Sequence, residues 1–124
     1  MKRILCVDDE PGIRDIMKDY FTALKFSIDV AEEGNEALLR MENESYDLMI
    51  TDINMPNGMG GIELIQKVSE KNPLIHIIAI SGYLKNSEHL NKLPKETIYF
   101  EKPVKIKMLS EMVKGILNQQ ETVK

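Results

Sequence analysis

The sequence predicts an α/β fold in which a parallel β-sheet carries helices on both faces. Short apolar runs alternate with amphipathic stretches along the whole chain, five of each, which is typical of parallel strands connected through helices. The 124 residues, 43% of them hydrophobic, suffice for one globular core and not for two. We therefore expect one domain over residues 1–118 and a polar tail over residues 119–124.

The strand candidates are short apolar runs bounded by charged residues, glycine or proline. Their lengths suit strands that are buried on both faces of a sheet. They are Arg3 to Val7, Ser27 to Val30, Asp47 to Thr51, Ile75 to Ile80 and Thr97 to Phe100.

The first and last helices are predicted from apolar residues at three- and four-residue spacing, which share one helix face. We expect both stripes to face the core. The stripe of the first helix, which starts near Pro11, is Ile13, Ile16, Met17, Tyr20, Phe21 and Leu24. The stripe of the last helix is Ile106, Leu109, Met112, Val113, Ile116 and Leu117.

Three further helices are expected between these two, ended by polar residues or by proline. They cover Asn35 to Asn43, Gly61 to Lys71 and Leu84 to Leu93. Methionine is flexible and fills irregular gaps in cores, and five of the eight methionines are interpreted in that way. These are Met17, Met41, Met49, Met108 and Met112.

The composition argues against several classes of protein. A formal charge of −4 and a pI near 5.2 leave little basic surface for nucleic-acid phosphates, so direct binding of nucleic acid is not expected. No apolar stretch approaches the roughly 20 residues that cross a bilayer, and the apolar run after Arg3 is too short for a secretion signal. We expect a cytoplasmic protein without a membrane segment, in which the single cysteine, Cys6, is buried.

Residues that carry chemistry follow the predicted strands. Asp8 and Asp9 follow the first strand, Asp52 the third, Ser81 the fourth and Lys102 the fifth. In an open parallel sheet these ends meet at one edge, where ligands bind. Carboxylates gathered there repel one another unless a hard cation with oxygen ligands holds them ionised, which predicts Mg²⁺. A carboxylate can also attack phosphorus, so the same edge is suited to phosphoryl transfer.

On these residues the chain resembles the receiver domains of response regulators in two-component systems, over essentially its whole length. Five separated segments carry the resemblance: VDDE, DINMP, ISG, the aromatic Tyr99 within IYFEKP, and the KP of that segment. Each is common alone, and their occurrence at the ends of alternating strands gives the match its specificity. The resemblance implies a doubly wound, five-stranded parallel sheet of order 2-1-3-4-5, a flavodoxin-like topology.

The resemblance also implies a metal site and a phosphoacceptor. Asp52 is similar to the residue that takes the phosphoryl group in this family. Asp8 and Asp9 correspond to the metal-site acids, and Asn54 to the residue whose backbone carbonyl binds the metal. Together with Asp52 these groups are expected to hold Mg²⁺. Lys102 would pair with the phosphoryl group.

Other matching positions imply a conformational response. Ser81 and Tyr99 are similar to the family's switch pair, in which the hydroxyl moves toward the phosphoryl group and the aromatic ring follows. A cis peptide bond is implied before Pro103. Tyr83, two residues beyond Ser81, is expected to shield the acyl phosphate from water.

The implied function is signal transduction in a phosphorelay. A sensor histidine kinase or a histidine-phosphotransfer protein would donate the phosphoryl group to Asp52, with Mg²⁺ present. The chain would not be an enzyme in its own right, although it would assist its own phosphorylation and dephosphorylation. Its altered surface would then signal to a downstream protein, and a dimer that depends on phosphorylation fits the same scheme.

Two segments depart from the family pattern. MPNGMGG, after Asp52, is one residue longer than usual, which predicts a differently shaped loop. LPKETI stands where the fourth helix commonly ends in Gly-Ala, so the shape of that helix is open.

Three other functions compete with this interpretation. A haloacid-dehalogenase-type enzyme would need a second aspartate as general acid where Asn54 stands. A flavodoxin-like nucleotide binder would need a neutral phosphate loop after the first strand, where Asp8, Asp9 and Glu10 would repel phosphate. A degenerate receiver acting as a scaffold would lack part of the site, and no position is missing.

Overall fold

The computed structural model describes residues 1–55, 58–82 and 91–118. Five parallel strands form one sheet of order β2-β1-β3-β4-β5, as the resemblance implies. The strands are β1 (Arg3–Val7), β2 (Ser27–Ala31), β3 (Leu48–Asp52), β4 (His76–Ser81) and β5 (Ile98–Glu101).

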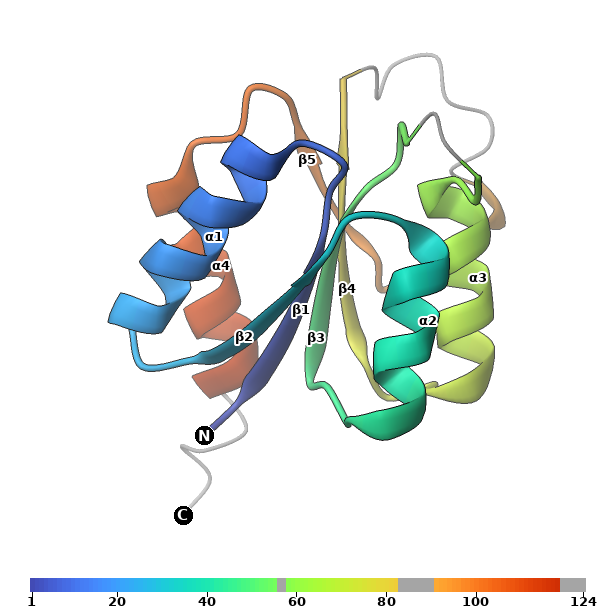
Figure 1. The fold of residues 1–124 in the computed structure, drawn as a ribbon, viewed down its shortest axis with the longest axis horizontal. Coiled ribbons are helices and arrows are strands. Elements are labelled where there is room, and N and C mark those ends of the chain that lie inside the picture. Colours follow the sequence, from blue (N-terminus) through green and yellow to red (C-terminus); the bar gives the residue numbers. More distant parts are fainter. Residues whose placement is uncertain (56–57, 83–90, 119–124) are drawn as a thin grey trace.

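The described helices cover both faces of this sheet (Figure 1). They are α1 (Pro11–Ala23), α2 (Gly34–Asn43), α3 (Gly61–Lys71) and α4 (Ile106–Asn118). The helices α1 and α4 pack on one face, and α2 and α3 on the other. Most of the expected Leu84 to Leu93 helix lies outside the described residues, as does the tail over residues 119–124.

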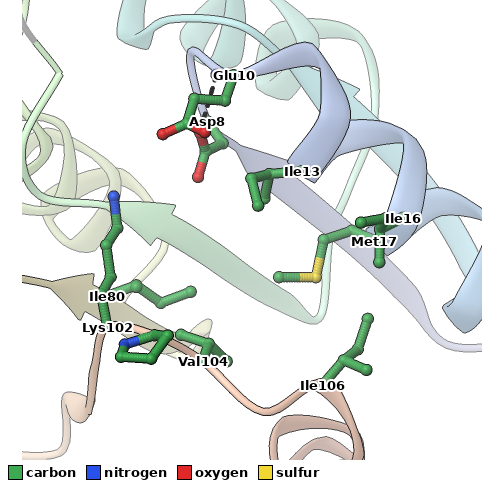
Figure 2. Close-up of a pocket in the computed structure, with 10 residues that line it drawn as sticks. Asp8, Glu10, Ile13, Ile16, Met17, Ile80, Lys102, Val104 and Ile106 are labelled. Atoms are coloured by element: carbon green, nitrogen blue, oxygen red, sulfur yellow. Dashed lines mark hydrogen bonds between the residues drawn. The ribbon is translucent and has the colours of Figure 1, made fainter.

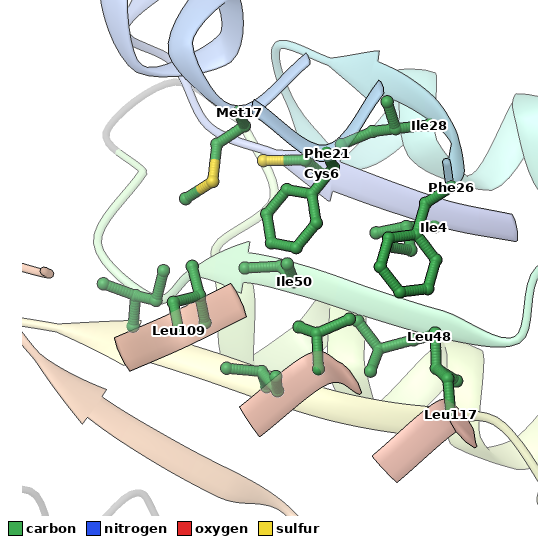
Figure 3. Packing of buried hydrophobic residues seen from close by; sticks show 13 residues of the cluster. Ile4, Cys6, Met17, Phe21, Phe26, Ile28, Leu48, Ile50, Leu109 and Leu117 are labelled. Atoms are coloured by element: carbon green, nitrogen blue, oxygen red, sulfur yellow. The ribbon is translucent and has the colours of Figure 1, made fainter. Parts of the chain in front are cut away.

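Two apolar clusters fill the space between the sheet and its helices. On the α1 and α4 face, Phe21 and Leu109 meet Ile50 of the central strand, all without exposed surface (Figure 3). On the other face, Leu64 of α3 packs with Met49 of the same strand. Consecutive residues of β3 point to opposite faces of the sheet. Because helices cover both faces, every residue of that strand is buried.

Several residues predicted to face the core are exposed. Ile16 is 54% exposed, Met108 61% and Met112 39%, so these assignments are wrong. Each residue lies on the flank of its stripe, and the helix periodicity gives the direction of a side chain but not the width of the surface that covers it. Met108 and Met112 also lie on the helix beside β5, the strand at the edge of the sheet.

β1 ends where the sequence predicts, and each of the other four strands ends one residue further along the chain than predicted. Asp52 pairs with Ile80 and Ser81 pairs with Glu101, so Asp52 and Ser81 are the last residues of β3 and β4. These side chains are therefore held by the sheet itself, which is more rigid than a connecting loop.

A polar network around Arg3 lies at the amino ends of the strands, opposite the carboxyl ends that carry Asp52 and Ser81. Its guanidinium contacts Glu44 at 2.6 Å and Asp29 at 3.4 Å, and lies 5.3 Å from the centre of the Tyr46 ring. The Tyr46 hydroxyl donates to Asp29. This network ties β1 to the outer strand β2 and to the segment that enters β3.

Two further expectations concern single features. Cys6 is 1% exposed, and burial raises the pKa of its thiol to about 12, so it is an inert core residue. Among the described residues, no helix is both long enough and apolar enough to cross a membrane.

Candidate functional site

The polar residues predicted to meet lie at the carboxyl edge of the sheet. Asp8 directly follows β1, Asp52 ends β3, Ser81 ends β4 and Lys102 directly follows β5. Because the strands are parallel and β1, β3, β4 and β5 are successive neighbours, their ends bring these side chains to one place.

Asp52 is a buried carboxylate with two hydrogen-bond donors. Its side chain is 1% exposed. The Lys102 ammonium donates to Oδ2 over 2.8 Å, and the backbone N–H of Asn54 donates to Oδ1 over 3.0 Å. These two contacts hold the Asp52 carboxylate in one orientation at the end of β3.

Asp8 is fixed by its backbone as well as by its side chain. Its N–H donates to the Ala31 carbonyl over 3.1 Å, and its Oδ1 accepts from the N–H of Glu10 over 2.9 Å. Burial raises the pKa of Asp8 to about 6, and the charge of Asp52 adds to this rise, while the Glu10 N–H and Lys102 oppose it. Asp8 and Lys102 line the same cavity, and Lys102 contacts Asp52, so the three groups lie in one site.

Lys102 is the cation of the site. Burial lowers its pKa, but the hydrogen bond and the charge of Asp52 outweigh burial, so the net shift is upward. Asp8 and Glu10 push the pKa in the same upward direction. The Lys102–Pro103 peptide bond is cis, as the resemblance implies.

Three consecutive acids form a group able to hold a metal ion. One ligand atom from each of Asp8, Asp9 and Glu10 can lie within 4.8 Å of the others. Carboxylate oxygens are the ligands that Mg²⁺ prefers, so this donor set fits that ion. The predicted set contained Asp52 and the Asn54 carbonyl in place of Glu10, and those ligand roles stay predictions.

Ser81 and Tyr99 lie on neighbouring strands. Ser81 is 2% exposed; its hydroxyl donates to Oδ1 of Asn54 over 3.5 Å, and its carbonyl accepts from the Lys102 N–H over 2.9 Å. Tyr99 pairs with Ala79 and packs with it on the α2 and α3 face. Because Ala79 and Ser81 are two residues apart in β4, Ser81 and Tyr99 face the same side of the sheet.

Glycines follow Asp52 in the chain, and one of them packs against the Asp52 backbone. Gly58 has φ +77°, a conformation that suits glycine. A Cβ at Gly61 would lie 2.3 Å from the Asp52 carbonyl oxygen and 2.6 Å from the Ile53 Cα. The start of α3 therefore packs directly against the backbone of Asp52.

A cavity of about 540 Å³ opens beside the acids. Asp8, Glu10 and Lys102 lie at one end, and Ile13 and Met17 of α1 line an apolar wall (Figure 2). The remaining lining residues are Ile16, Ile80, Pro103, Val104 and Ile106. We call the part of the carboxyl edge that carries Asp8, Asp9 and Glu10 the acid edge. It is continuous with an apolar recess between α1 and the segment that leads into α4.

The sequence matches the family model for the response regulator receiver domain over residues 4–114. This chain belongs to that family. The response regulator TrrA of Thermotoga maritima, solved in complex with Mg²⁺ and BeF, is 36% identical with a TM-score of 0.79, over 93% of this chain and 98% of that one. A CheY-like receiver domain protein of Methanospirillum hungatei is 35% identical with a TM-score of 0.83, over 98% and 97% of the two chains.

Curated relatives contain the receiver domain within longer proteins. The sensor protein EvgS of Escherichia coli is 38% identical over 85 residues, which are 68% of this chain and 7% of EvgS. The regulatory protein VanRB of Enterococcus faecalis is 28% identical over 120 residues, 94% of this chain and 53% of VanRB. This receiver domain spans only part of the length of these relatives.

Two residues at the site were not predicted from the sequence. Glu10 is not among the metal ligands that the resemblance implies, and its position next to Asp8 and Asp9 is the signal that could have found it. Arg14 donates from Nη1 to the Asp8 carbonyl over 2.8 Å, and nothing in the spacing indicated this contact. Tyr83, the predicted shield, lies outside the described residues.

Proposed function

We propose that this receiver domain takes a phosphoryl group on Asp52 from a phosphohistidine donor and transmits its phosphorylation state to a protein partner. One observation carries the proposal: Asp52 is a buried carboxylate paired with Lys102 beside a group of acids able to hold a cation. A single buried ion pair could be structural, but the acids next to it add negative charge, which a structural ion pair does not need.

The chemistry follows from these groups. A carboxylate oxygen of Asp52 attacks phosphorus, and a P–O bond forms while the P–N bond to the donor imidazole breaks and leaves its electron pair on nitrogen. The Lys102 ammonium, which lies 2.8 Å from the Asp52 carboxylate, then pairs with the transferred phosphoryl oxygens and offsets part of their negative charge. Mg²⁺ bound by Asp8, Asp9 and Asp52 would neutralise further charge on those oxygens.

The donor is proposed to be a sensor histidine kinase or a histidine-phosphotransfer protein. TrrA, solved in complex with the histidine kinase ThkA, is 35% identical to this chain, over 94% of it and 99% of TrrA. The apolar recess that ends at Asp8 and Lys102 offers a donor protein contact area next to the acceptor. The chain itself acts as a substrate that assists its own reaction, rather than as an enzyme. Dimerisation on phosphorylation, the downstream partner and the cytoplasmic location are further parts of this proposal.

The experiment that tests the acceptor uses acetyl phosphate and Mg²⁺. We expect one phosphoryl group on Asp52, labile to hydroxylamine, because Asp52 is the carboxylate paired with Lys102. Mass spectrometry of the intact chain and of its peptides locates the group. Equal labelling of Asp52→Asn, or labelling of Ser81 in the parent, contradicts the assignment.

Mg²⁺ is expected to raise the thermal midpoint of the unmodified chain. A ligand that binds only the folded state stabilises it by about 2.7 kcal/mol at 100 times its dissociation constant. Asp9→Ala should remove most of this response, since Asp9 belongs to the acid group. Melting curves with Mg²⁺ and with EDTA measure the effect; a full response in Asp9→Ala shows that the metal is held elsewhere.

The signal is proposed to leave the site through Ser81 and Tyr99. A phosphoryl group on Asp52 gives the Ser81 hydroxyl a stronger acceptor than the Asn54 oxygen, which lies 3.5 Å away. Movement of Ser81 frees space on the face that it shares with Tyr99. One charge-assisted hydrogen bond gives less than the roughly 5.5 kcal/mol that a complete switch requires, so a partial shift is expected until a partner binds.

Amide hydrogen exchange with and without beryllofluoride measures this switch. We expect altered exchange in β5 (Ile98–Glu101) as well as around Asp52, and loss of the β5 change in Ser81→Ala. Tyr99→Ala separates movement of the ring from movement of the hydroxyl. Changes confined to the loops around Asp52 in the parent would mean that β5 takes no part.

A further inference from the structure

We propose that Arg14 is a positioning residue of the acid edge, holding the Asp8–Asp9 peptide so that both carboxylates face a divalent cation. The inference rests on the proposed function, because it concerns the same group of acids. Arg14 lies in the second turn of α1 and points back toward the end of β1. It touches neither Asp52 nor Lys102 in any described contact, so its effect on the site is indirect.

The guanidinium of Arg14 connects two loops at this edge. Nη1 donates to the Asp8 carbonyl oxygen over 2.8 Å, and Nη2 lies 3.7 Å from the carboxylate of Glu32, which follows β2. The Arg14 side chain is only 17% exposed, while that of Glu32 is 66% exposed. A planar guanidinium can serve both partners at once, which a lysine ammonium cannot do in the same geometry.

The Asp8 carbonyl belongs to the peptide unit that joins the two acids. Its orientation therefore sets the ψ angle of Asp8 and the φ angle of Asp9. The Asp8 N–H is already held by Ala31 and its carboxylate by Glu10, so the carbonyl is the remaining polar group of this residue, and Arg14 holds it. Without Arg14 the peptide plane can rotate, which redirects the Asp9 carboxylate relative to that of Asp8.

The positive charge of Arg14 and its hydrogen bond to the Asp8 carbonyl have opposite effects on cation binding. A guanidinium near a cation site repels the cation, so a purely electrostatic role predicts that Mg²⁺ binds more tightly when Arg14 is removed. A positioning role predicts weaker binding. Groups that orient metal ligands typically change metal affinity by about 10- to 100-fold, so the sign of the change separates the two roles.

The test is isothermal titration of the full chain with Mg²⁺ as the only ligand. Arg14→Met keeps the apolar stem and removes the donors and the charge; Arg14→Lys keeps the charge and an ammonium donor but not the planar guanidinium. Arg40→Met is the matched control, because Arg40 pairs with Glu36 within α2 at 3.6 Å, away from the acids. We expect the dissociation constant to rise about tenfold in Arg14→Met and by less in Arg14→Lys, with no change in Arg40→Met.

Thermal midpoints in EDTA complete the test. Arg14→Met should melt close to the parent there, so that a change in affinity is not a loss of folding; if it fails to fold, Arg14→Lys decides by the same measurement. Unchanged or tighter Mg²⁺ binding in the Arg14 variants, or an equal loss in Arg40→Met, overturns the positioning role alone. A parent chain that binds no Mg²⁺ overturns the proposed metal site, and this role with it.

Discussion

Gly61→Ala is expected to lower the free energy of unfolding by about 3 kcal/mol, at the upper end of the usual cost of overpacking. The added Cβ would lie 2.3 Å from the Asp52 carbonyl oxygen and 2.6 Å from the Ile53 Cα. Both atoms belong to the backbone and cannot rotate away, so the start of α3 or the end of β3 must shift. Urea denaturation measures the loss, which corresponds to roughly 10 °C in the thermal midpoint.

Gly115→Ala is the matched control for this prediction. Gly115 lies within α4, and a Cβ there meets nothing within 4 Å. Alanine is favoured over glycine inside helices by about 0.5–1 kcal/mol, so this variant should be more stable than the parent. A loss below about 1 kcal/mol in Gly61→Ala would show that α3 can move away from Asp52 without cost. Slower phosphorylation is expected alongside the instability, because the shift displaces Asp52.

Asp8→Asn is expected to stabilise the metal-free chain at pH 7 by about 3 kcal/mol, since one unit of pKa corresponds to about 1.4 kcal/mol. Asp8 is 4% exposed, and its pKa in the folded chain is about 6, against an ordinary value of 3.8. The folded state thus binds this proton more tightly than the unfolded state does. Asparagine cannot ionise, but its side-chain oxygen can still accept from the Glu10 N–H.

The pH dependence gives the sign of this effect. A raised carboxyl pKa stabilises the folded state fully below about pH 4, and this contribution is lost as the pH rises through 6. The stability gained in Asp8→Asn should therefore be about a third of its full size near pH 4.5 and reach its full size by pH 7.5. Denaturation in EDTA across this range measures it, with Asp15→Asn, an exposed acid on α1, as the control. A difference that does not grow with pH contradicts the assignment to Asp8.

Mg²⁺ at about 1,000 times its dissociation constant should reverse the order of the two chains, because it then stabilises the folded parent by about 4.1 kcal/mol. The parent gains stability when a cation holds the acids ionised, and Asp8→Asn has lost one of those charges. The lower stability of the metal-free parent is then the cost of the acids in the proposed metal site, a trade-off common at functional sites.

The sequence was sufficient to place Asp8, Asp52, Ser81 and Lys102 together, because each stands at the end of an apolar run. Because the strands are parallel, residues at their carboxyl ends lie close together at one edge of the sheet. The bounds of α3 were predicted as observed, since Gly61 and Asn72-Pro73 mark its two ends. The strand ends were placed less well, because pairing across the sheet decides where a strand stops.

Other features depend on distances that no local pattern encodes. The contact of Arg14 with the Asp8 carbonyl requires the shape of the loop between them, and its approach to Glu32 requires that β1 and β2 be neighbours. The closeness of Gly61 to the Asp52 backbone depends on how α3 packs against the end of β3. Ile16 is exposed because the packing of α1 against its neighbours, and not its periodicity, sets the boundary of the core.

The polar network around Arg3 lies at the far edge of the sheet from the acids. It joins β1, β2 and the entry to β3, and Asp8 and Asp52 stand at the other ends of β1 and β3. The two groups of polar residues therefore lie at opposite ends of the strands. Substitutions near Arg3 are therefore expected to change the stability of the fold while the contacts of Asp8, Asp52 and Lys102 stay as they are.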